Sequence, residues 1–203
     1  MKKTIVCLFL LLLWGCADPV HFADSTVIVD FKGSGTVVRI ENYGKIECVY
    51  ILTCAHVVPQ DSPLAIVFSR HDPYFGLRVR AEIGMGFVRH RDGGIDLAIV
   101  EVFVPAGTAK AVRIGRLPPR LGEKLWCSSY PLGKYILTTG VAAGQDGNEL
   151  LSSAAVYGGS SGGGVYNRWG ELVGIVRKRT IHNIAGYVPV SKRMVEAMLK
   201  KRD

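Results

Sequence analysis

Short runs of apolar and β-branched residues alternate with Gly, Pro, Asn and Asp along most of the chain. Runs of this kind, bounded by turn residues, are typical of β-strands. The high glycine content, 24 residues, also favours a β protein with many tight turns over a helical bundle. We predict strands at positions 25–31, 34–40, 48–54, 64–69, 77–83, 96–102, 124–130, 135–143, 171–176 and 185–190.

One segment near the C-terminus has helical periodicity instead. Ser191 is a candidate N-cap for the segment KRMVEAMLKK that follows it. The apolar residues of this segment form a single stripe at helical spacing, namely Met194, Val195, Met198 and Leu199. Many strands followed by one terminal helix, with no repeat or linker, indicate an all-β barrel or sandwich in one unit.

The N-terminus has the pattern of a secretory signal peptide. Two lysines precede an apolar run at positions 5–14, which is too short to span a bilayer. The run ends in LWGCAD, which resembles the lipobox of bacterial lipoproteins. Leu13 and Gly15 precede Cys16 as that pattern requires, whereas Trp14 departs from it. The resemblance implies cleavage before Cys16 and a lipid on that residue. The alternative is ordinary cleavage after Ala17, which gives a secreted protein.

These features divide the chain into a signal peptide at 1–16, a short tether at 17–24 and one domain at 25–203. The formal net charge of +8 falls to about +6 once the two signal lysines are removed. The basic clusters are short and are not interleaved with aromatic residues, so we do not expect nucleic-acid binding. We expect an exported basic protein to meet anionic lipid, cell-wall polymer or acidic substrates.

Three cysteines lie in the predicted domain. Cys48 and Cys54 belong to one predicted strand, where they would stand about 20 Å apart and beyond the reach of a disulfide. Cys127 can pair with either, but all three lie in apolar strand patterns, which favours buried thiols. Cys54 and His56 are too close in sequence for a persuasive metal motif, and we expect neither a metal nor a cofactor.

Three segments combine into a candidate catalytic constellation. His56 follows a strand in LTCAHVV, Asp96 opens a strand in GGIDLAIVEV, and two serines lie in the glycine-rich segment at 156–167. A serine nucleophile needs a base, an acid that orients the base, and donors for the oxyanion. Glycine lets consecutive backbone N–H groups converge on one point, which explains its density beside the serines. Asp92 is the alternative acid and lies in an apparent turn.

The blocks TCAH, DLA and GSSGG, in this order, resemble those of the trypsin-like serine proteases, closest to the bacterial Deg or high-temperature-requirement branch. YPLGKYILTTGVAAG, GELVGIV and AGYVPVSKRMV also resemble segments of that family, so that the likeness runs from about Val27 to Leu199. It covers the protease domain only. The resemblance implies a double β-barrel with a C-terminal helix, whose active site lies between the barrels.

The resemblance also implies a role for each matching residue. His56 is the general base, Asp96 holds its tautomer and Ser161 is the nucleophile. The N–H groups of Gly159 and Ser161 form the oxyanion hole. Ser161, rather than the adjacent serine, has a glycine two positions before it and two glycines after it.

Two departures stand out. Ser160 replaces the family's Asn or Asp, and Gly164 replaces its usual Pro. Because Ser160 is uncharged, the resemblance implies that activation by a newly cut N-terminus is not needed. The extra glycine implies a more flexible backbone around the oxyanion hole.

The expected function is that of an exported serine endopeptidase of the bacterial cell envelope, acting on proteins or peptides. In this fold the residue six positions before the nucleophile, here Ala155, lies at the base of the pocket for the residue that precedes the cut. Val156, Val176 and Arg177 are the neighbouring candidates. An uncharged pocket base does not offset the desolvation of Lys or Arg, so we expect small or medium aliphatic residues there. The alternatives are a catalytically weak domain that binds peptides or envelope proteins, and an esterase that uses the same triad.

Overall fold

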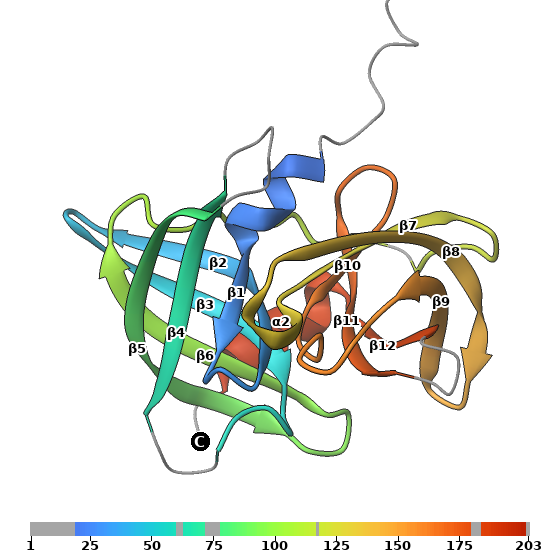
Figure 1. The fold of residues 1–203 in the computed structure, drawn as a ribbon. Helices are drawn as coiled ribbons and strands as arrows, with labels where there is room; N and C mark the ends of the chain where they lie inside the picture. Colours follow the sequence, from blue (N-terminus) through green and yellow to red (C-terminus); the bar gives the residue numbers. More distant parts are fainter. Residues whose placement is uncertain (1–18, 60–62, 72–77, 117, 180–183, 202–203) are drawn as a thin grey trace, which may run out of the picture.

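The computed structural model describes residues 19–59, 63–71, 78–116, 118–179 and 184–201, which form two β-barrels lying side by side (Figure 1). The predicted signal peptide and Cys16 lie outside these residues, and their assignment stays a prediction. Among the described residues, no helix combines the length and the apolar character that a membrane-spanning helix needs.

The first barrel is a closed antiparallel sheet with the strand order β1-β2-β3-β6-β5-β4. Its core contains the valines, isoleucines and leucines of the predicted alternating runs, such as Val27, Ile51 and Ile99, all fully buried. Its strands are β1 (Thr26–Val29), β2 (Gly33–Tyr43), β3 (Ile46–Cys54), β4 (Leu64–His71), β5 (Arg78–Asp92) and β6 (Leu97–Pro105).

The second barrel closes in the order β10-β11-β12-β9-β8-β7. Its strands are β7 (Lys124–Ser129), β8 (Ile136–Asp146), β9 (Glu149–Ala155), β10 (Gly164–Tyr166), β11 (Leu172–Arg179) and β12 (Ile184–Pro189), with the short 3₁₀ helix η3 (Pro131–Gly133) after β7. The strands β9 and β10 are not among those predicted from the sequence. Serine and alanine residues weaken the strand pattern of β9, and β10 has only three residues.

The helix α2 (Lys192–Lys200) begins where the sequence predicts it, because the Ser191 side chain accepts a hydrogen bond from the Met194 N–H at 3.3 Å. Val195, Met198 and Leu199 are buried in the apolar cluster that contains the core of the first barrel and extends into the second. Arg89 Nε on β5 donates to the carbonyl oxygen of Leu199 at 3.0 Å. The predicted fold class, a double β-barrel with a C-terminal helix, is confirmed (Figure 1).

Residues 19–25 form a 3₁₀ helix, η2 (Pro19–Ser25), at the N-terminal end of the described chain. Phe22 is buried and its ring stacks on that of Tyr166, with 4.1 Å between the ring centroids. Part of the segment predicted as a tether therefore packs on the domain. Cys48, Cys54 and Cys127 are free and buried, which confirms the expectation of buried thiols.

Candidate active site

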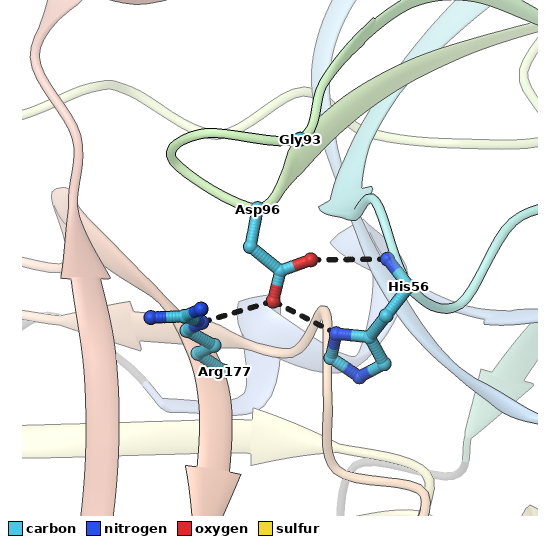
Figure 2. A pocket seen from close by; sticks show the side chains of 4 residues that line it. All are labelled: His56, Gly93, Asp96 and Arg177. Carbon is cyan, nitrogen blue, oxygen red and sulfur yellow. Dashed lines mark hydrogen bonds and ion pairs between the residues drawn. The ribbon is translucent and has the colours of Figure 1, made fainter.

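His56 and Asp96 are brought together by the pairing of β3 with β6. Cys54 and Leu97 are partners in this antiparallel pair, so the residues just beyond them meet at the same end of the barrel. His56 Nδ1 lies 2.8 Å from Asp96 Oδ2, and the His56 backbone N–H donates to Asp96 Oδ1 at 3.0 Å (Figure 2). A further bond from the Ala55 N–H to the Asp96 carbonyl oxygen holds the two backbones in register at 3.1 Å.

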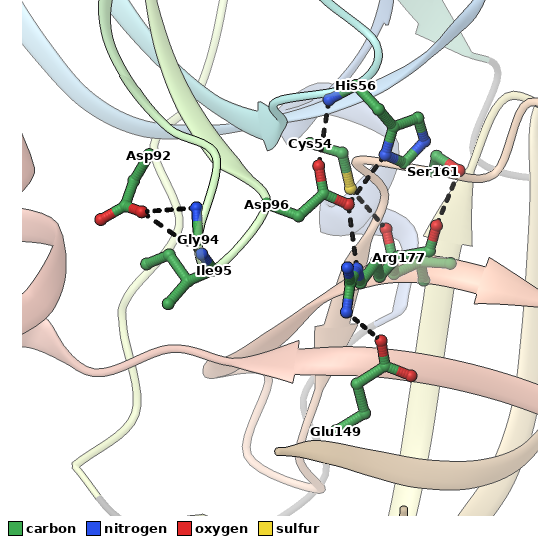
Figure 3. Close-up of polar contacts among 10 residues, drawn as sticks. Cys54, His56, Asp92, Gly94, Ile95, Asp96, Glu149, Ser161 and Arg177 are labelled. Carbon is green, nitrogen blue, oxygen red and sulfur yellow. Dashed lines mark hydrogen bonds and ion pairs between the residues drawn. The ribbon is translucent and has the colours of Figure 1, made fainter. Parts of the chain in front are cut away.

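Asp96 occupies a left-handed backbone conformation with φ of 59°. Aspartate tolerates this region better than most residues, and the tight turn before Asp96 places its carboxylate behind the imidazole. Asp92 caps that turn by accepting hydrogen bonds from the N–H groups of Gly94 and Ile95, at 3.0 and 3.3 Å. Asp92, the alternative candidate for the catalytic acid, therefore stabilises the turn, while Asp96 contacts His56 (Figure 3).

The glycine-rich loop belongs to the second barrel but is held by Ser34 of the first. The Ser34 N–H donates to the Ser161 carbonyl oxygen at 2.7 Å, and its hydroxyl donates to the Gly159 carbonyl oxygen at 2.8 Å. The same hydroxyl accepts from the Tyr130 N–H at 2.8 Å. Ser34 is fully buried, so these bonds lie away from water at the junction of the barrels. They place Ser161 next to the first barrel and its histidine.

Glycine is required at two positions of this loop. Gly159 and Gly162 have φ of +91° and +89°, a region that side chains disfavour. A Cβ atom at Gly162 would also overlap the Ser34 carbonyl oxygen and the Thr53 hydroxyl. The close approach of the two barrels at this point therefore excludes any larger residue.

The two adjacent serines have different surroundings. Ser160 is buried, and its hydroxyl accepts from the Ser129 hydroxyl and from the Tyr157 N–H, at 3.0 and 3.1 Å. The Ser161 hydroxyl donates to the Arg177 carbonyl oxygen at 3.0 Å, and among the described contacts it forms no hydrogen bond with His56. Within the part of the chain that the structure describes, the N–H groups of Gly159 and Ser161 have no acceptor.

The Arg177 side chain lies against Asp96. Its Nε donates to Asp96 Oδ2 at 3.0 Å, and its Nη1 donates to Glu149 Oε1 at 2.5 Å (Figure 3). The hydrogen bond to Glu149 raises the pKa of Arg177, while its partial burial acts in the opposite direction. The guanidinium is therefore charged at every pH of interest.

The predicted pocket residues do not share one surface. Arg177 lines a pocket of about 440 Å³ together with His56, Gly93 and Asp96 (Figure 2). Val156 and Val176 are buried in the core of the second barrel, and Ala155 is half-buried at the end of β9. Those three residues are not part of the lining of this pocket.

One group of donor atoms at the site has the spacing of metal ligands. The side-chain donors of Cys54, His56 and Asp96 lie within 4.8 Å of one another. The thiol is buried and donates to the Val176 carbonyl oxygen at 3.1 Å, and burial raises the pKa of Cys54 far above its ordinary value. In this arrangement the thiol takes part in a hydrogen bond with the backbone of the second barrel.

Comparison with known proteins agrees with this geometry. A family model described as a trypsin-like peptidase domain matches residues 33–175, more than half of the chain. The chain belongs to the trypsin-like peptidase family. It is 28% identical over 187 residues to a protein named "Serine protease HtrA-like" from Staphylococcus aureus strain bovine RF122 / ET3-1, and equally to one from strain USA300. The alignment covers 80% of this chain but 22% of each relative, so this trypsin-like peptidase spans about a fifth of their length.

Two solved structures share the fold of this trypsin-like peptidase. The HtrA-type protease AlgW has a TM-score of 0.65 at 20% identity, covering 83% of this chain and 50% of the other. The serine endoprotease from Yersinia pestis has a TM-score of 0.68 at 22% identity, covering 90% and 64%. The predicted resemblance to the Deg, or HtrA, branch is confirmed by these comparisons.

Two residues of this trypsin-like peptidase site, and the role of a third, are not predicted by the sequence pattern. Ser34 lies between two glycines at the start of a strand, and this GSG pattern is a local signal of close backbone packing. Glu149 has no such signal, because its partner Arg177 is far along the chain. Arg177 was expected as a pocket residue, and its contact with Asp96 is the role that the sequence pattern does not predict.

Proposed function

We propose that this chain is an exported serine endopeptidase in which Ser161, His56 and Asp96 act as a catalytic triad. The observation that carries the proposal is the 2.8 Å contact between His56 Nδ1 and Asp96 Oδ2, with Ser161 on the adjacent loop. Because Asp96 accepts the Nδ1 proton, the imidazole presents Nε2 as the basic nitrogen. Ser160, which is buried and already hydrogen-bonded, is the poorer nucleophile.

The reaction proceeds by acyl transfer. The Ser161 hydroxyl leaves the Arg177 carbonyl oxygen and gives its proton to His56 Nε2 while Oγ bonds to the substrate carbonyl carbon. The N–H groups of Gly159 and Ser161 stabilise the resulting oxyanion. His56 then protonates the leaving amine as the C–N bond breaks. Water attacks the acyl-enzyme, its proton passes to His56, and breakage of the ester returns that proton to Ser161.

Proteins or peptides are the proposed substrates. A structural neighbour, the HtrA-type protease AlgW, was solved with a decapeptide. The uncharged, half-buried Ala155 supports a small or medium aliphatic residue before the cut. The apolar run at 5–14 supports export to the bacterial envelope, and LWGCAD supports a lipid anchor on Cys16.

One observation favours a second candidate, a catalytically weak domain that binds peptides. The Ser161 hydroxyl donates to the Arg177 carbonyl oxygen at 3.0 Å, so the serine must rotate before His56 can deprotonate it. A site that remained in this arrangement would hold a peptide without cleaving it.

Labelling with a fluorophosphonate probe separates the two candidates. We expect the probe to label the native protein, Ser161→Ala to lose both labelling and peptide cleavage, and Ser160→Ala to keep most of both. Removal of a triad serine costs about 10⁶ in turnover in a related protease. Absence of labelling in folded wild-type protein would favour the binding module, and a dead Ser160→Ala with an active Ser161→Ala would reassign the nucleophile.

A further inference from the structure

We infer that Arg177 is a positioning residue for Asp96 and that Glu149 supplies the counter-charge that lets it act without neutralising Asp96. The inference rests on the proposed function, in which Asp96 orients His56. It extends the pair of His56 and Asp96 into a hydrogen-bonded series of four residues. Arg177 from β11 and Glu149 from β9 are the two added members.

The geometry fixes the Asp96 carboxylate from three directions. Oδ1 accepts from the His56 backbone N–H at 3.0 Å, and Oδ2 accepts from Arg177 Nε at 3.0 Å beside its 2.8 Å contact with the imidazole (Figure 3). The Asp96 side chain is only 11% exposed. Rotation of the carboxylate would break the bond to Arg177, so the guanidinium holds Oδ2 toward Nδ1.

Charge explains why Glu149 is needed. A guanidinium on the same oxygen as the imidazole disfavours the imidazolium that forms during catalysis, because like charges repel. Glu149 is 5% exposed at its side chain and bonds the other side of the guanidinium. Taken by themselves, Asp96, Arg177 and Glu149 carry one net negative charge, as a lone aspartate would. Asp96 can thus be held firmly and still stabilise the imidazolium.

Apart from the imidazole, the other described groups beside Asp96 and the Arg177 side chain carry no charge that would replace Glu149. The Cys54 thiol, from β3, stays neutral because burial raises its pKa. Asp92 is turned toward the N–H groups of its own turn. Ser161 is uncharged and contacts Arg177 through the backbone carbonyl oxygen. Arg177 therefore contacts the proposed acid with its side chain and the proposed nucleophile with its backbone.

The test is the pH dependence of kcat/KM for a small peptide ester, measured from about pH 5.5 to 9.5. Arg177 Nε and His56 Nδ1 contact the same Asp96 oxygen, so the guanidinium charge lies within about 6 Å of the imidazole. Loss of one of the two neighbouring charges in a variant should therefore move the midpoint by roughly 0.5 to 1 pH unit. Arg177→Gln should move the midpoint to higher pH, because a cation is lost. Glu149→Gln should move it to lower pH, and the double variant should return it close to the wild-type value.

Arg177→Lys separates charge from geometry. Lysine keeps the charge but cannot hold both carboxylates in the planar fork of arginine. We expect this variant to keep the wild-type midpoint and to lose about tenfold in kcat, with little change in KM. A purely structural role for Arg177 would lower activity in all variants without moving the midpoints in opposite directions.

An NMR titration of the His56 imidazole in a Ser161→Ala background gives a readout that does not need activity. The Arg177→Gln and Glu149→Gln exchanges should move this midpoint in the same opposite directions. Unmoved midpoints, or shifts of one sign in both variants, would overturn the inference. If Glu149→Gln does not fold, the comparison of Arg177→Gln with Arg177→Lys decides. Failure of the proposed function is distinct, because it appears as absent probe labelling in the wild-type protein.

Discussion

Replacing Ser34 with alanine should both destabilise the protein and impair the proposed oxyanion hole. Ser34 is fully buried, and its hydroxyl bridges the Gly159 carbonyl oxygen and the Tyr130 N–H. Alanine preserves the backbone bond to the Ser161 carbonyl oxygen but removes both side-chain bonds. The exchange therefore tests whether this hydroxyl holds the glycine-rich loop against the first barrel.

The magnitude follows from the groups left without partners. Each buried backbone group that loses its hydrogen bond costs about 1–3 kcal/mol, so the two groups together should cost roughly 2–6 kcal/mol of unfolding free energy. Release of the Gly159 carbonyl also frees the adjoining peptide groups. We therefore expect fluorophosphonate labelling to slow by about tenfold or more, since loss of a single oxyanion donor costs about 10²–10³.

The assay is urea unfolding followed by tryptophan fluorescence, with labelling rates measured on the folded protein. Ser69→Ala is a matched control, because Ser69 is also buried but, in the described part of the chain, its hydroxyl has no hydrogen-bond partner. It should be neutral or slightly stabilising. A Ser34→Ala variant as stable as Ser69→Ala, with a wild-type labelling rate, would refute the reasoning.

Two further predictions concern the site and the core. Asp96→Asn should fold, because asparagine also tolerates a left-handed backbone. It should lose about 10⁴ in kcat, because the wrong tautomer of His56 would face Ser161. A normal rate on a small ester substrate would remove Asp96 from the triad. Burial raises the pKa of the Cys127 thiol to about 12. The unfolded chain ionises at lower pH, so the unfolding free energy should fall above about pH 8.5, by up to about 1.4 kcal/mol per pH unit for this thiol. Cys127→Ala should show a shallower decline in urea unfolding between about pH 9 and 10, and an unchanged slope would contradict this account.

Local pattern alone determined most of the fold. Alternating apolar residues predict ten of the strands, and the stripe with its Ser191 cap predicts the terminal helix. These elements follow from side chains that are near in sequence. The strand β9 could not be predicted in this way, because its serine and alanine residues have little strand preference. It forms because β8 and β12 satisfy its backbone on both edges.

The order of the three motifs along the chain was likewise enough to select His56, Asp96 and Ser161 as the candidate triad. Only the tertiary structure decided which groups hold them. Ser34 and Gly159 are 125 residues apart, and Arg177 and Asp96 are 81 apart. Such pairs depend on how two closed barrels meet, and a hydrogen bond across that junction leaves no periodic trace in the sequence. The same junction makes Arg177, which lines the pocket, a partner of Asp96 as well.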